Sequence, residues 1–398
     1  MTTVELMAAS AKYLANTYAR FPIVLVKGQG ARLWDSDGKE YLDFVGGIAV
    51  DALGHCHPRM VEAIRAQAET LIHVSNLYHI EPQIRLGELL CEHSFADRVF
   101  FCNSGAEANE AAIKLARKYA KDHWSTDRFE IIVMRHSFHG RTLATVAATG
   151  NEKYWHGFES LVPGFKHVPY DDLSAVERAI DSHTCAILVE PVQGEGGVNV
   201  PGEDYLLGLR RLCDQAGILL ILDEVQSGMG RTGTLFAYQQ CGVEPDIMTL
   251  AKALAGGLPM GAMLAREHVA ASFIPGTHAS TFGGTPFVSA VAHAVVTTII
   301  QEDLPGNAAR VGKYFLDRLA SLKDKHRTVT AVRGKGLILG VEVSVPAQTL
   351  VAGCMERGLL TLTAGENVVR FVPPLIVREA EVDQAVGILG ESLANLSQ

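Results

Sequence analysis

The sequence predicts an α/β protein with a large domain, built on a mostly parallel mixed sheet, and a smaller α+β domain. Short apolar runs alternate with helical patterns from about residue 57 to residue 264. Such alternation is typical of parallel strands with helices on both faces of the sheet. A long helical stretch follows, from Thr285 to about residue 323, and the residues after it mix strands with helices. This change of pattern separates the two domains.

The first 55 residues do not follow this alternation. Residues 5–18 have the spacing of a short amphipathic helix. Residues 23–45 alternate in the manner of strands around the turn signal Asp35-Ser-Asp-Gly38, and a glycine-rich connector occupies residues 46–54. We therefore predict three parts: an N-terminal segment that packs with the small domain (1–55), a large α/β domain (56–290) and a C-terminal small α+β domain (291–398).

Apolar runs and helical spacing predict the individual elements. In the large domain the strands are Arg98–Cys102, Glu130–Met134, Ala186–Val189, Ile218–Leu222, Ile247–Leu250 and Gly261–Leu264, and the helices are 104–120, 172–181 and 204–216. In the small domain the strands lie within 329–343 and 359–376, and the helices are 346–357 and 379–395. Polar or glycine-rich loops follow four strands, at 103–107, 136–141, 190–197 and 223–226. Because open α/β sheets bind ligands at the carboxyl ends of their strands, we expect the functional site there.

Composition excludes several kinds of protein. The net charge is −9 and the basic residues are scattered, which argues against nucleic acid as a partner. The seven cysteines lie far apart without a Cys-x-x-Cys pair, so we expect reduced thiols in a cytosolic protein. No signal pattern and no apolar run of ~18 residues predicts a membrane span. His55-Cys-His57 has no second ligand cluster, so we expect a polar turn there and no metal.

Two apolar runs end at charged residues. The run 217–222 stops at Asp223, and Pro245–Ala251 stops at Lys252. A lysine and an aspartate at the ends of two buried strands are costly unless a ligand lies between them. Pyridoxal phosphate would fit, because its aldehyde needs a lysine amine, its ring nitrogen needs a carboxylate and its phosphate needs a helix N-terminus. Lys252 would bind the aldehyde and later move a proton between carbon atoms.

The loop from Asn103 to Glu107 joins a strand to a helix. Taken alone, Ser104 and Glu107 have the spacing of a helix-capping box. With Lys252 and Asp223 expected nearby, we favour a phosphate site. There Ser104, Gly105 and Ala106 would leave backbone N–H groups free at a helix N-terminus, where an anion is stabilised.

Two further loop residues are candidates for the faces of the cofactor ring. Phe138 lies in a loop beside His139-Gly-Arg141 rather than in an apolar run, which favours stacking on the ring, and Val225 would pack on the opposite face. Arg141 is a candidate for binding a substrate carboxylate, since guanidinium and carboxylate groups pair through two hydrogen bonds. The alternative for Arg141 is a surface ion pair.

A nucleotide-hydrolysing enzyme is the alternative from another class. Its acidic strand would be Leu220–Glu224. Such an enzyme needs Gly-x-x-x-x-Gly-Lys-Ser/Thr to hold phosphates. The three Gly-Lys pairs of this chain are followed by Glu40, Tyr314 and Gly336, so that motif is missing.

The chain resembles the class III aminotransferases of pyridoxal-phosphate fold type I, with motifs in both domains. Those motifs are Gly54-His-Cys-His-Pro58, Asn103-Ser-Gly-Ala-Glu-Ala-Asn-Glu-Ala111, Phe138-His-Gly-Arg-Thr142, Glu190-Pro-Val-Gln-Gly-Glu-Gly196, Leu222-Asp-Glu-Val-Gln-Ser-Gly-Met-Gly-Arg-Thr-Gly233, Ser280-Thr-Phe-Gly-Gly284, Arg333-Gly-Lys-Gly336 and Val369-Arg-Phe-Val-Pro-Pro374. The likeness is greatest to the members that act on N-acetylornithine.

The resemblance implies a role for each site residue that holds the cofactor. Lys252 would bond to the aldehyde, Asp223 would pair with the ring nitrogen and Gln226 would reach the ring hydroxyl. Gly105 and Ala106 would hold the phosphate. The resemblance also implies a homodimer in which Thr281 reaches the phosphate bound to the partner subunit.

The substrates implied are a small-molecule amino donor and 2-oxoglutarate. Ser280 would lie near the substrate, and Arg141 would bind the carboxylate farthest from the reacting amine. Glu195 and Arg370 would form a gate. Their pairing would neutralise Arg370 while the ω-amine donor is bound. When 2-oxoglutarate arrives, Arg370 would be released and would hold its α-carboxylate.

Ile48 bears on the choice of donor. Ornithine aminotransferases carry a tyrosine at this position, and an apolar residue suits an acylated amine better than a free ammonium group. Succinylornithine, succinyldiaminopimelate, ornithine and 4-aminobutyrate stay open as donors. The chain departs from the family pattern at Asp51, where asparagine is usual, and at Ala255, Ala279 and Thr285.

Overall fold

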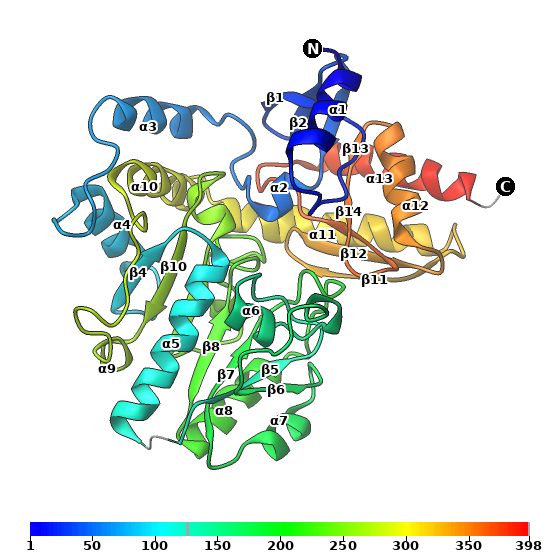
Figure 1. Ribbon diagram of the computed structural model, residues 1–398. Coiled ribbons are helices and arrows are strands. Elements are labelled where there is room, and N and C mark those ends of the chain that lie inside the picture. Colours follow the sequence, from blue (N-terminus) through cyan, green and yellow to red (C-terminus); the bar gives the residue numbers. More distant parts are fainter. Residues whose placement is uncertain (125–126, 397–398) are drawn as a thin grey trace.

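The computed structural model describes residues 1–124 and 127–396. Its largest sheet has seven strands in the order β4-β10-β9-β8-β7-β5-β6 (Figure 1). β10 is antiparallel to both neighbours and the other pairs are parallel, which confirms the predicted mostly parallel mixed sheet. The strands are β4 (Arg98–Cys102), β5 (Glu130–Met134), β6 (Phe165–Val168), β7 (Thr184–Val189), β8 (Leu219–Asp223), β9 (Ile247–Leu250) and β10 (Gly261–Ala265).

Helices cover both faces of this sheet (Figure 1). Ile131 and Val133 of β5 pack into a core cluster with the alanine-rich face of α5, while Ile132 and Met134 pack into a second cluster that includes α8. Burial on both faces explains why the strands are continuous apolar runs rather than alternating ones. The elements of this part are α5 (Gly105–His123), α6 (Leu143–Ala148), η1 (Glu152–Tyr154), α7 (Leu173–Ala179), α8 (Tyr205–Ala216), η2 (Ala237–Gln240), η3 (Lys252–Ala255) and α9 (Glu267–Ala270).

There are two smaller sheets, and one of them joins the beginning of the chain to its end. Their orders are β1-β2-β3-β13 and β11-β12-β15-β14, and β13 pairs in parallel with β3. The first strands therefore share a sheet with C-terminal residues, and both termini lie on this side of the molecule (Figure 1). The boundaries after residues 55 and 290 stay predictions. The elements are α1 (Thr3–Tyr13), β1 (Leu25–Gln29), β2 (Arg32–Asp35), β3 (Glu40–Asp43), α2 (Gly46–Ala49), β11 (Val329–Lys335), β12 (Ile338–Val343), α12 (Ala347–Glu356), β13 (Leu359–Leu360), β14 (Leu362–Thr363), β15 (Val368–Phe371) and α13 (Glu379–Asn395).

Four more helices lie between these parts. α3 (Pro58–Ala68) and α4 (Glu81–Glu92) pack against α10 (Pro286–Gln301), and α11 (Leu304–Lys323) packs against β11. The sequence predicted one helical stretch over 285–323, but the structure has two helices bent by 60°. The break falls at Asp303, whose φ of 47° is left-handed. Within the described residues no single helix is long and apolar enough to cross a membrane, and α10 and α11 meet that test only as a bent pair.

Two other predictions from the sequence differ from the structure. The helix predicted over 5–18 ends at Tyr13, and none of its residues is fully buried. The strand β6 was not predicted. Lys166 and His167 interrupt its apolar pattern, and a strand at the edge of the sheet keeps such residues partly exposed.

Three phenylalanines form the centre of the smaller lobe. Phe44 follows β3, Phe315 lies on α11 and Phe371 ends β15, and all three are fully buried. The ring of Phe315 packs edge-on against both others, with centroid distances of 5.5 and 5.3 Å. This contact joins the N-terminal strands to the C-terminal sheet.

Phe315→Ala is therefore expected to lower the free energy of unfolding by about 3–5 kcal/mol, because it leaves a cavity where three elements meet. Chemical unfolding followed by circular dichroism would measure the change. Phe158→Ala is the matched control, since Phe158 is 62% exposed, and it should change stability by less than about 0.5 kcal/mol. Equal losses in the two variants would contradict this assignment of the core.

Candidate active site

The predicted polar loops begin at one edge of the large sheet. β4 runs in the same direction as β9, because both are antiparallel to β10. β5, β7 and β8 are also parallel to β9 through successive pairs. Their carboxyl ends meet at one edge, where open α/β sheets bind ligands. The predicted loops start at this edge, with Asn103, His136, Glu190 and Asp223 as their first residues.

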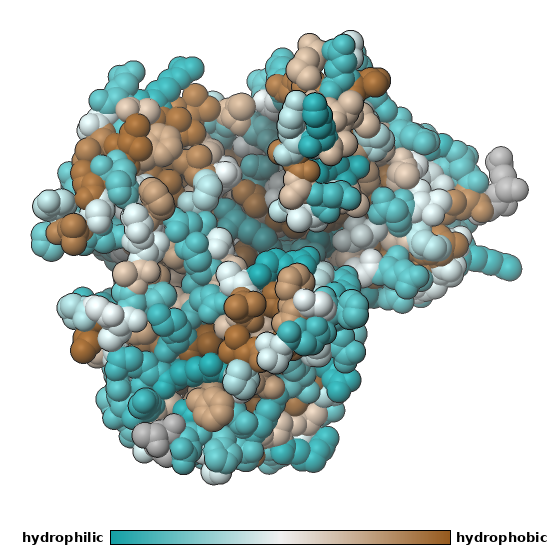
Figure 2. Space-filling model, in the orientation of Figure 1, coloured by the Kyte–Doolittle hydropathy of each residue, from teal (hydrophilic) through white to brown (hydrophobic). Residues whose placement is uncertain are grey.

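A cavity of about 410 Å³ opens at this edge. Its volume is in the range of roughly 300–1,000 Å³ that is typical of small-molecule sites. Figure 2 shows this face of the molecule hollowed near its centre. Most of the predicted site residues line the cavity: Ser104, Gly105, Ala106, Phe138, Arg141, Asp223, Val225, Gln226 and Lys252.

Asp223 ends β8 and is only 3% exposed. One carboxylate oxygen, Oδ2, accepts a hydrogen bond from Asn109 Nδ2 at 2.7 Å and lies 2.7 Å from Nδ1 of His139. The other oxygen, Oδ1, accepts from the backbone N–H of Val225 at 3.0 Å. These donors are neutral groups, except for His139 when it is protonated. The carboxylate is thus held in place while its charge remains available to a cationic group in the cavity.

Lys252 lies two residues beyond β9, at the start of η3. Its φ of 46° is left-handed, a conformation that costs a non-glycine residue of order 1–3 kcal/mol and that is concentrated at functional sites. Burial lowers the pKa of its amine below the ordinary value, and this outweighs the opposite effect of the Glu195 carboxylate. A lowered pKa makes the amine a better nucleophile and base.

The N-terminus of α5 borders the cavity. Ser104 caps the helix, since its hydroxyl accepts from the backbone N–H of Glu107 at 3.1 Å. The Glu107 carboxylate accepts from the backbone N–H of Asn103 rather than that of Ser104, so only half of a capping box forms. Among the described residues, the backbone N–H groups of Gly105 and Ala106 have no acceptor. A helix end with free N–H groups is an anion site.

Gly105 is required at this position by packing. A Cβ atom there would lie 2.8 Å from Cγ1 of Val225. The missing side chain lets Val225 approach the helix end. Val225 and Phe138 both line the cavity, as expected for residues that enclose a flat ring.

Glu195 and Arg370 form an ion pair beside the cavity. Arg370 is 1% exposed, and its Nη1 donates to Glu195 Oε1 at 2.7 Å and to Gln226 Oε1 at 3.1 Å. Burial raises the pKa of the Glu195 carboxyl, but the charge and hydrogen bond of Arg370, together with Lys252 and Gln226, outweigh this and lower it. The Gln226 amide also donates to Glu195 at 3.4 Å. The structure therefore brings together the two residues predicted to form a gate, and joins Gln226 to them.

Three predicted residues lie at the rim or beyond it. Arg141 is exposed, and its guanidinium stacks on Tyr154 at 4.1 Å from the ring centroid. The Ser280 hydroxyl accepts from Asn103 Nδ2 at 3.2 Å, so it reaches the edge of the site. Thr281 is exposed and does not line the cavity of its own chain.

Sequence reasoning missed three polar residues that line the cavity: Asn109, His139 and Glu190. Asn109 was detectable as a polar residue on the buried, alanine-rich face of its helix. Glu190 directly follows the buried strand β7, one residue beyond Val189, which pairs with Leu222 just before Asp223. Its Oε2 accepts from the backbone N–H of Phe138 at 3.1 Å. Burial, together with the nearby Asp223, raises the pKa of Glu190 well above its ordinary range.

These residues fit pyridoxal phosphate. Asp223 is a buried anion that needs a cationic partner such as a protonated ring nitrogen. The free N–H groups of Gly105 and Ala106 suit a phosphate, and Lys252 offers an amine of lowered pKa to an aldehyde. All of them line one cavity.

Comparison with known proteins agrees with this geometry. The family model described as aminotransferase class-III matches residues 13–393. The chain is 53% identical over 386 residues to an acetylornithine aminotransferase of Caldanaerobacter subterraneus subsp. tengcongensis, covering 97% of this chain and 98% of that one. The crystal structure of an ornithine aminotransferase from Toxoplasma gondii superposes with a TM-score of 0.96 at 36% identity, covering 100% of this chain and 96% of the other. That of an N-acetylornithine aminotransferase from Stenotrophomonas maltophilia gives 0.85 at 39%, covering 98% and 99%. The chain therefore belongs to the class III aminotransferases, a family of pyridoxal-phosphate-dependent transaminases.

Proposed function

We propose that this aminotransferase moves the δ-amino group of N-acetylornithine to 2-oxoglutarate, giving N-acetylglutamate 5-semialdehyde and glutamate, a reaction of arginine biosynthesis. The observation that carries the reaction class is the meeting of Lys252, Asp223 and the free N–H groups of Gly105 and Ala106 in one cavity. The donor rests on relatives about 50% identical over nearly the whole chain, which bear the name acetylornithine aminotransferase.

Each residue has a role that follows from its surroundings. When bound, pyridoxal phosphate links covalently to an amine and withdraws electrons from the neighbouring carbon atom. Asp223 keeps the ring nitrogen protonated, and Gly105, Ala106 and Ser104 hold the phosphate. Lys252 Nζ removes the proton from the carbon that bears the donor's amine, because its lowered pKa leaves a fraction of the amine neutral.

The faces and edges of the ring are enclosed by three other residues. Phe138 and Val225 pack on its two faces, and Gln226 reaches its hydroxyl group. In the structure the Gln226 amide contacts Glu195 and Arg370. Contact with the ring hydroxyl would require this amide to serve both neighbours or to turn away from the ion pair.

The Glu195–Arg370 pair lets one cavity accept two unlike substrates. While Glu195 holds Arg370 at 2.7 Å, the guanidinium is neutralised and does not attract a carboxylate near the reacting amine. Arrival of 2-oxoglutarate displaces Glu195, and Arg370 then binds its α-carboxylate. Arg141 at the rim binds the distant carboxylate of either substrate, and Ser280 lies near the substrate.

Succinylornithine, ornithine, succinyldiaminopimelate and 4-aminobutyrate are alternative donors for the same machinery. Two observations favour an acylated donor. Ile48 is apolar and 43% exposed, so it offers no partner for a free ammonium group. Val50, which lines the cavity, is apolar too.

We infer that the active form is a homodimer in which Thr281 reaches the phosphate site of the partner subunit. Large apolar side chains are exposed on the loop between α3 and α4, on α4 and on the loop before α10, and Figure 2 also shows apolar groups in the region of α3 and α4. We call these residues the apolar patch: Leu71, Ile72, Leu77, Tyr78, Ile84 and Phe282. A contiguous patch of this kind is typical of a protein interface.

All seven cysteines are free, which supports a cytosolic location.

The covalent attachment gives the first test. We expect the purified protein with pyridoxal phosphate to absorb visible light, and N-acetylornithine without any keto acid to bleach that band. Lys252→Ala should abolish the band and lower kcat by roughly 10⁴-fold or more, because both the nucleophile and the base are lost. Absorption spectra before and after addition of the donor measure this. A wild-type protein that keeps its band with N-acetylornithine would retain the family and refute the donor.

Glu195→Gln is expected to change which donor is preferred. The amide keeps the shape of the side chain but no longer neutralises Arg370. A donor whose carboxylate is attached to the reacting carbon, such as glutamate, can then pair with the free guanidinium. The ratio of kcat/KM for glutamate to that for N-acetylornithine should rise roughly tenfold, equivalent to ~1.4 kcal/mol. Glu342→Gln, which removes the partner of Arg333 outside the cavity, is the control. An unchanged ratio would count against the gate.

Mixed dimers test the proposed role of Thr281. If each site combines one subunit's Lys252 with the partner's Thr281, Lys252→Ala and Thr281→Ala chains that are unfolded and refolded together form dimers with one intact site. Activity should then rise to about a quarter of the wild-type value, since half of randomly paired dimers are mixed. The pair Lys252→Ala with Asp223→Ala is the control, because no mixed dimer of these has an intact site. No gain over the separate variants would place Thr281 in its own subunit's site.

A further inference from the structure

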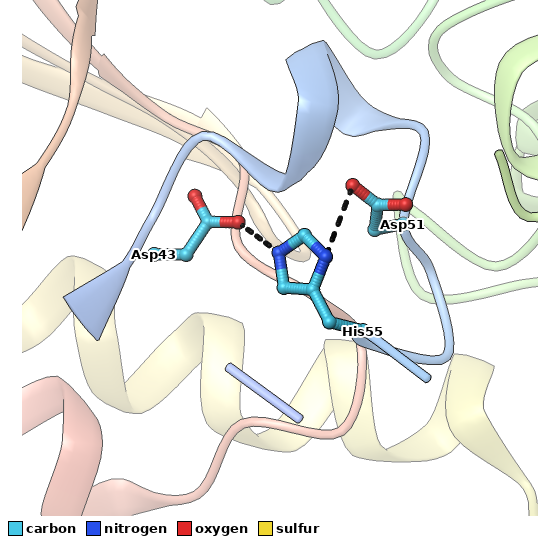
Figure 3. A group of neighbouring side chains, drawn as sticks. All are labelled: Asp43, Asp51 and His55. Carbon is cyan, nitrogen blue, oxygen red and sulfur yellow. Dashed lines mark hydrogen bonds and ion pairs between the residues drawn. The ribbon is translucent and has the colours of Figure 1, made fainter. Parts of the chain in front are cut away.

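A second group of ionisable side chains, Asp43, Asp51 and His55, lies outside the cavity lining (Figure 3). Asp43 ends β3, and its Oδ2 is 2.7 Å from Nε2 of His55. The other ring nitrogen of His55, Nδ1, faces Asp51 Oδ2 at 3.9 Å. Among the described residues these two carboxylates are the charged groups that act on the imidazole. Nε2 is within hydrogen-bond distance of one carboxylate and Nδ1 is within ion-pair distance of the other, so a protonated imidazolium is attracted by both.

The same aspartate fixes an unusual stretch of backbone. Asp43 Oδ1 accepts from the N–H groups of Val45 and Gly46, each at 2.9 Å. The four residues from Gly46 to Ala49 then have left-handed φ angles between 51° and 66°. Ile48 is one of them, and a β-branched side chain rarely adopts this conformation. Such strain persists only where surrounding contacts hold it.

Asp51 connects this stretch to the wall of the cavity. Its Oδ2 occupies the space where a side chain at Gly47 would lie, 2.7 Å from the Cβ position, and its Oδ1 lies 3.5 Å from the corresponding point at Gly257. Val50 lines the cavity on one side of this carboxylate, and Gly257 to Met260 line it on the other. His55 is itself fixed by two backbone hydrogen bonds with Gly30.

We propose that the Asp43–His55–Asp51 bridge positions the Gly46–Val50 segment against the 257–260 loop and thereby sets the affinity for the amino donor in a pH-dependent manner. His55 acts here as a positioning residue, since it does not line the cavity. The identity of the donor rests on the proposed function, whereas the bridge itself does not.

The direction of the pH effect follows from the charges. The hydrogen bond to Asp43 raises the pKa of His55 above its ordinary value. The bridge is therefore complete at lower pH and is lost as the pH rises through that raised pKa. Deprotonation leaves Asp51 without a cationic partner, and the segment loosens. Removing the Asp51 charge would shift this transition to lower pH, because that charge also raises the pKa of His55.

A divalent cation held by the same three residues is the competing explanation. The donor atoms lie close enough together for one. However, Asp43 Oδ1 is already used by two backbone N–H groups, and Asp43 Oδ2 already contacts the imidazole. An imidazolium satisfies the group without a metal.

The kinetic test compares His55→Gln and Asp51→Asn with Glu40→Gln, which removes an exposed carboxylate from the same strand as Asp43. In His55→Gln we expect the KM for N-acetylornithine to rise roughly tenfold or more, with kcat and the KM for 2-oxoglutarate little changed, since a small displacement of a binding wall weakens binding by such factors. The wild-type KM should rise with pH through one extra transition. That transition should vanish in His55→Gln, move to lower pH in Asp51→Asn and stay in Glu40→Gln.

Hydrogen–deuterium exchange gives a second readout that needs no substrate. Exchange of the peptide 44–53, normalised to the buried strand β7, should increase with pH in the wild type and be high at all pH values in His55→Gln. Equal behaviour of His55→Gln and Glu40→Gln in both experiments would overturn the proposal. So would a chelator that reproduces the His55→Gln result and is reversed by Zn²⁺. A wild type that shows the exchange transition but ignores N-acetylornithine would refute the donor and leave the bridge standing.

Discussion

The active site depends on the hydrogen bonds that hold the Asp223 side chain in place at the end of a buried strand. Asn109 donates to Asp223 and to the carbonyl of His139, while its own carbonyl accepts from Thr249 on β9 at 2.8 Å. One amide thus joins α5, β8, β9 and the loop after β5. Because its partners are mostly neutral donors, the Asp223 side chain remains available to a cationic ligand. The same contacts that fix the fold therefore fix the group proposed to bind the ligand's ring.

The other ionisable groups in and beside the cavity have pKa values shifted in different directions, because their surroundings differ. Burial and the nearby Asp223 raise the pKa of Glu190. Burial also raises that of Glu195, but Arg370 and the other neighbours together lower it. Burial lowers the pKa of Lys252. Shifts of this kind, grouped at one cavity, are typical of sites that combine proton transfer with charge recognition.

The sequence predicted the parts of the site that follow from strand position. Lys252, Asp223 and Gly105 stand at the ends of apolar runs, and parallel strands bring such ends together. Asn109 could not be assigned in this way, because its partners on β8 and β9 become neighbours only when the sheet forms. For the same reason His55 suggested only a polar turn. Asp43 approaches it through the left-handed backbone of residues 46–49, which no local pattern predicted.

In this chain the residues expected to hold the cofactor and the residues proposed to affect donor choice lie on different kinds of structure. The groups that would hold the cofactor lie on or beside strands of the large sheet, which is packed against core residues on both faces. Val50, which lines the cavity, directly follows the left-handed backbone of residues 46–49, which Asp43 and Asp51 contact. The Toxoplasma gondii ornithine aminotransferase shares the fold at a TM-score of 0.96 although only 36% of its residues are identical. Because unlike functions share one fold, we expect the donor to be distinguished by particular side chains at the cavity rather than by the sheet.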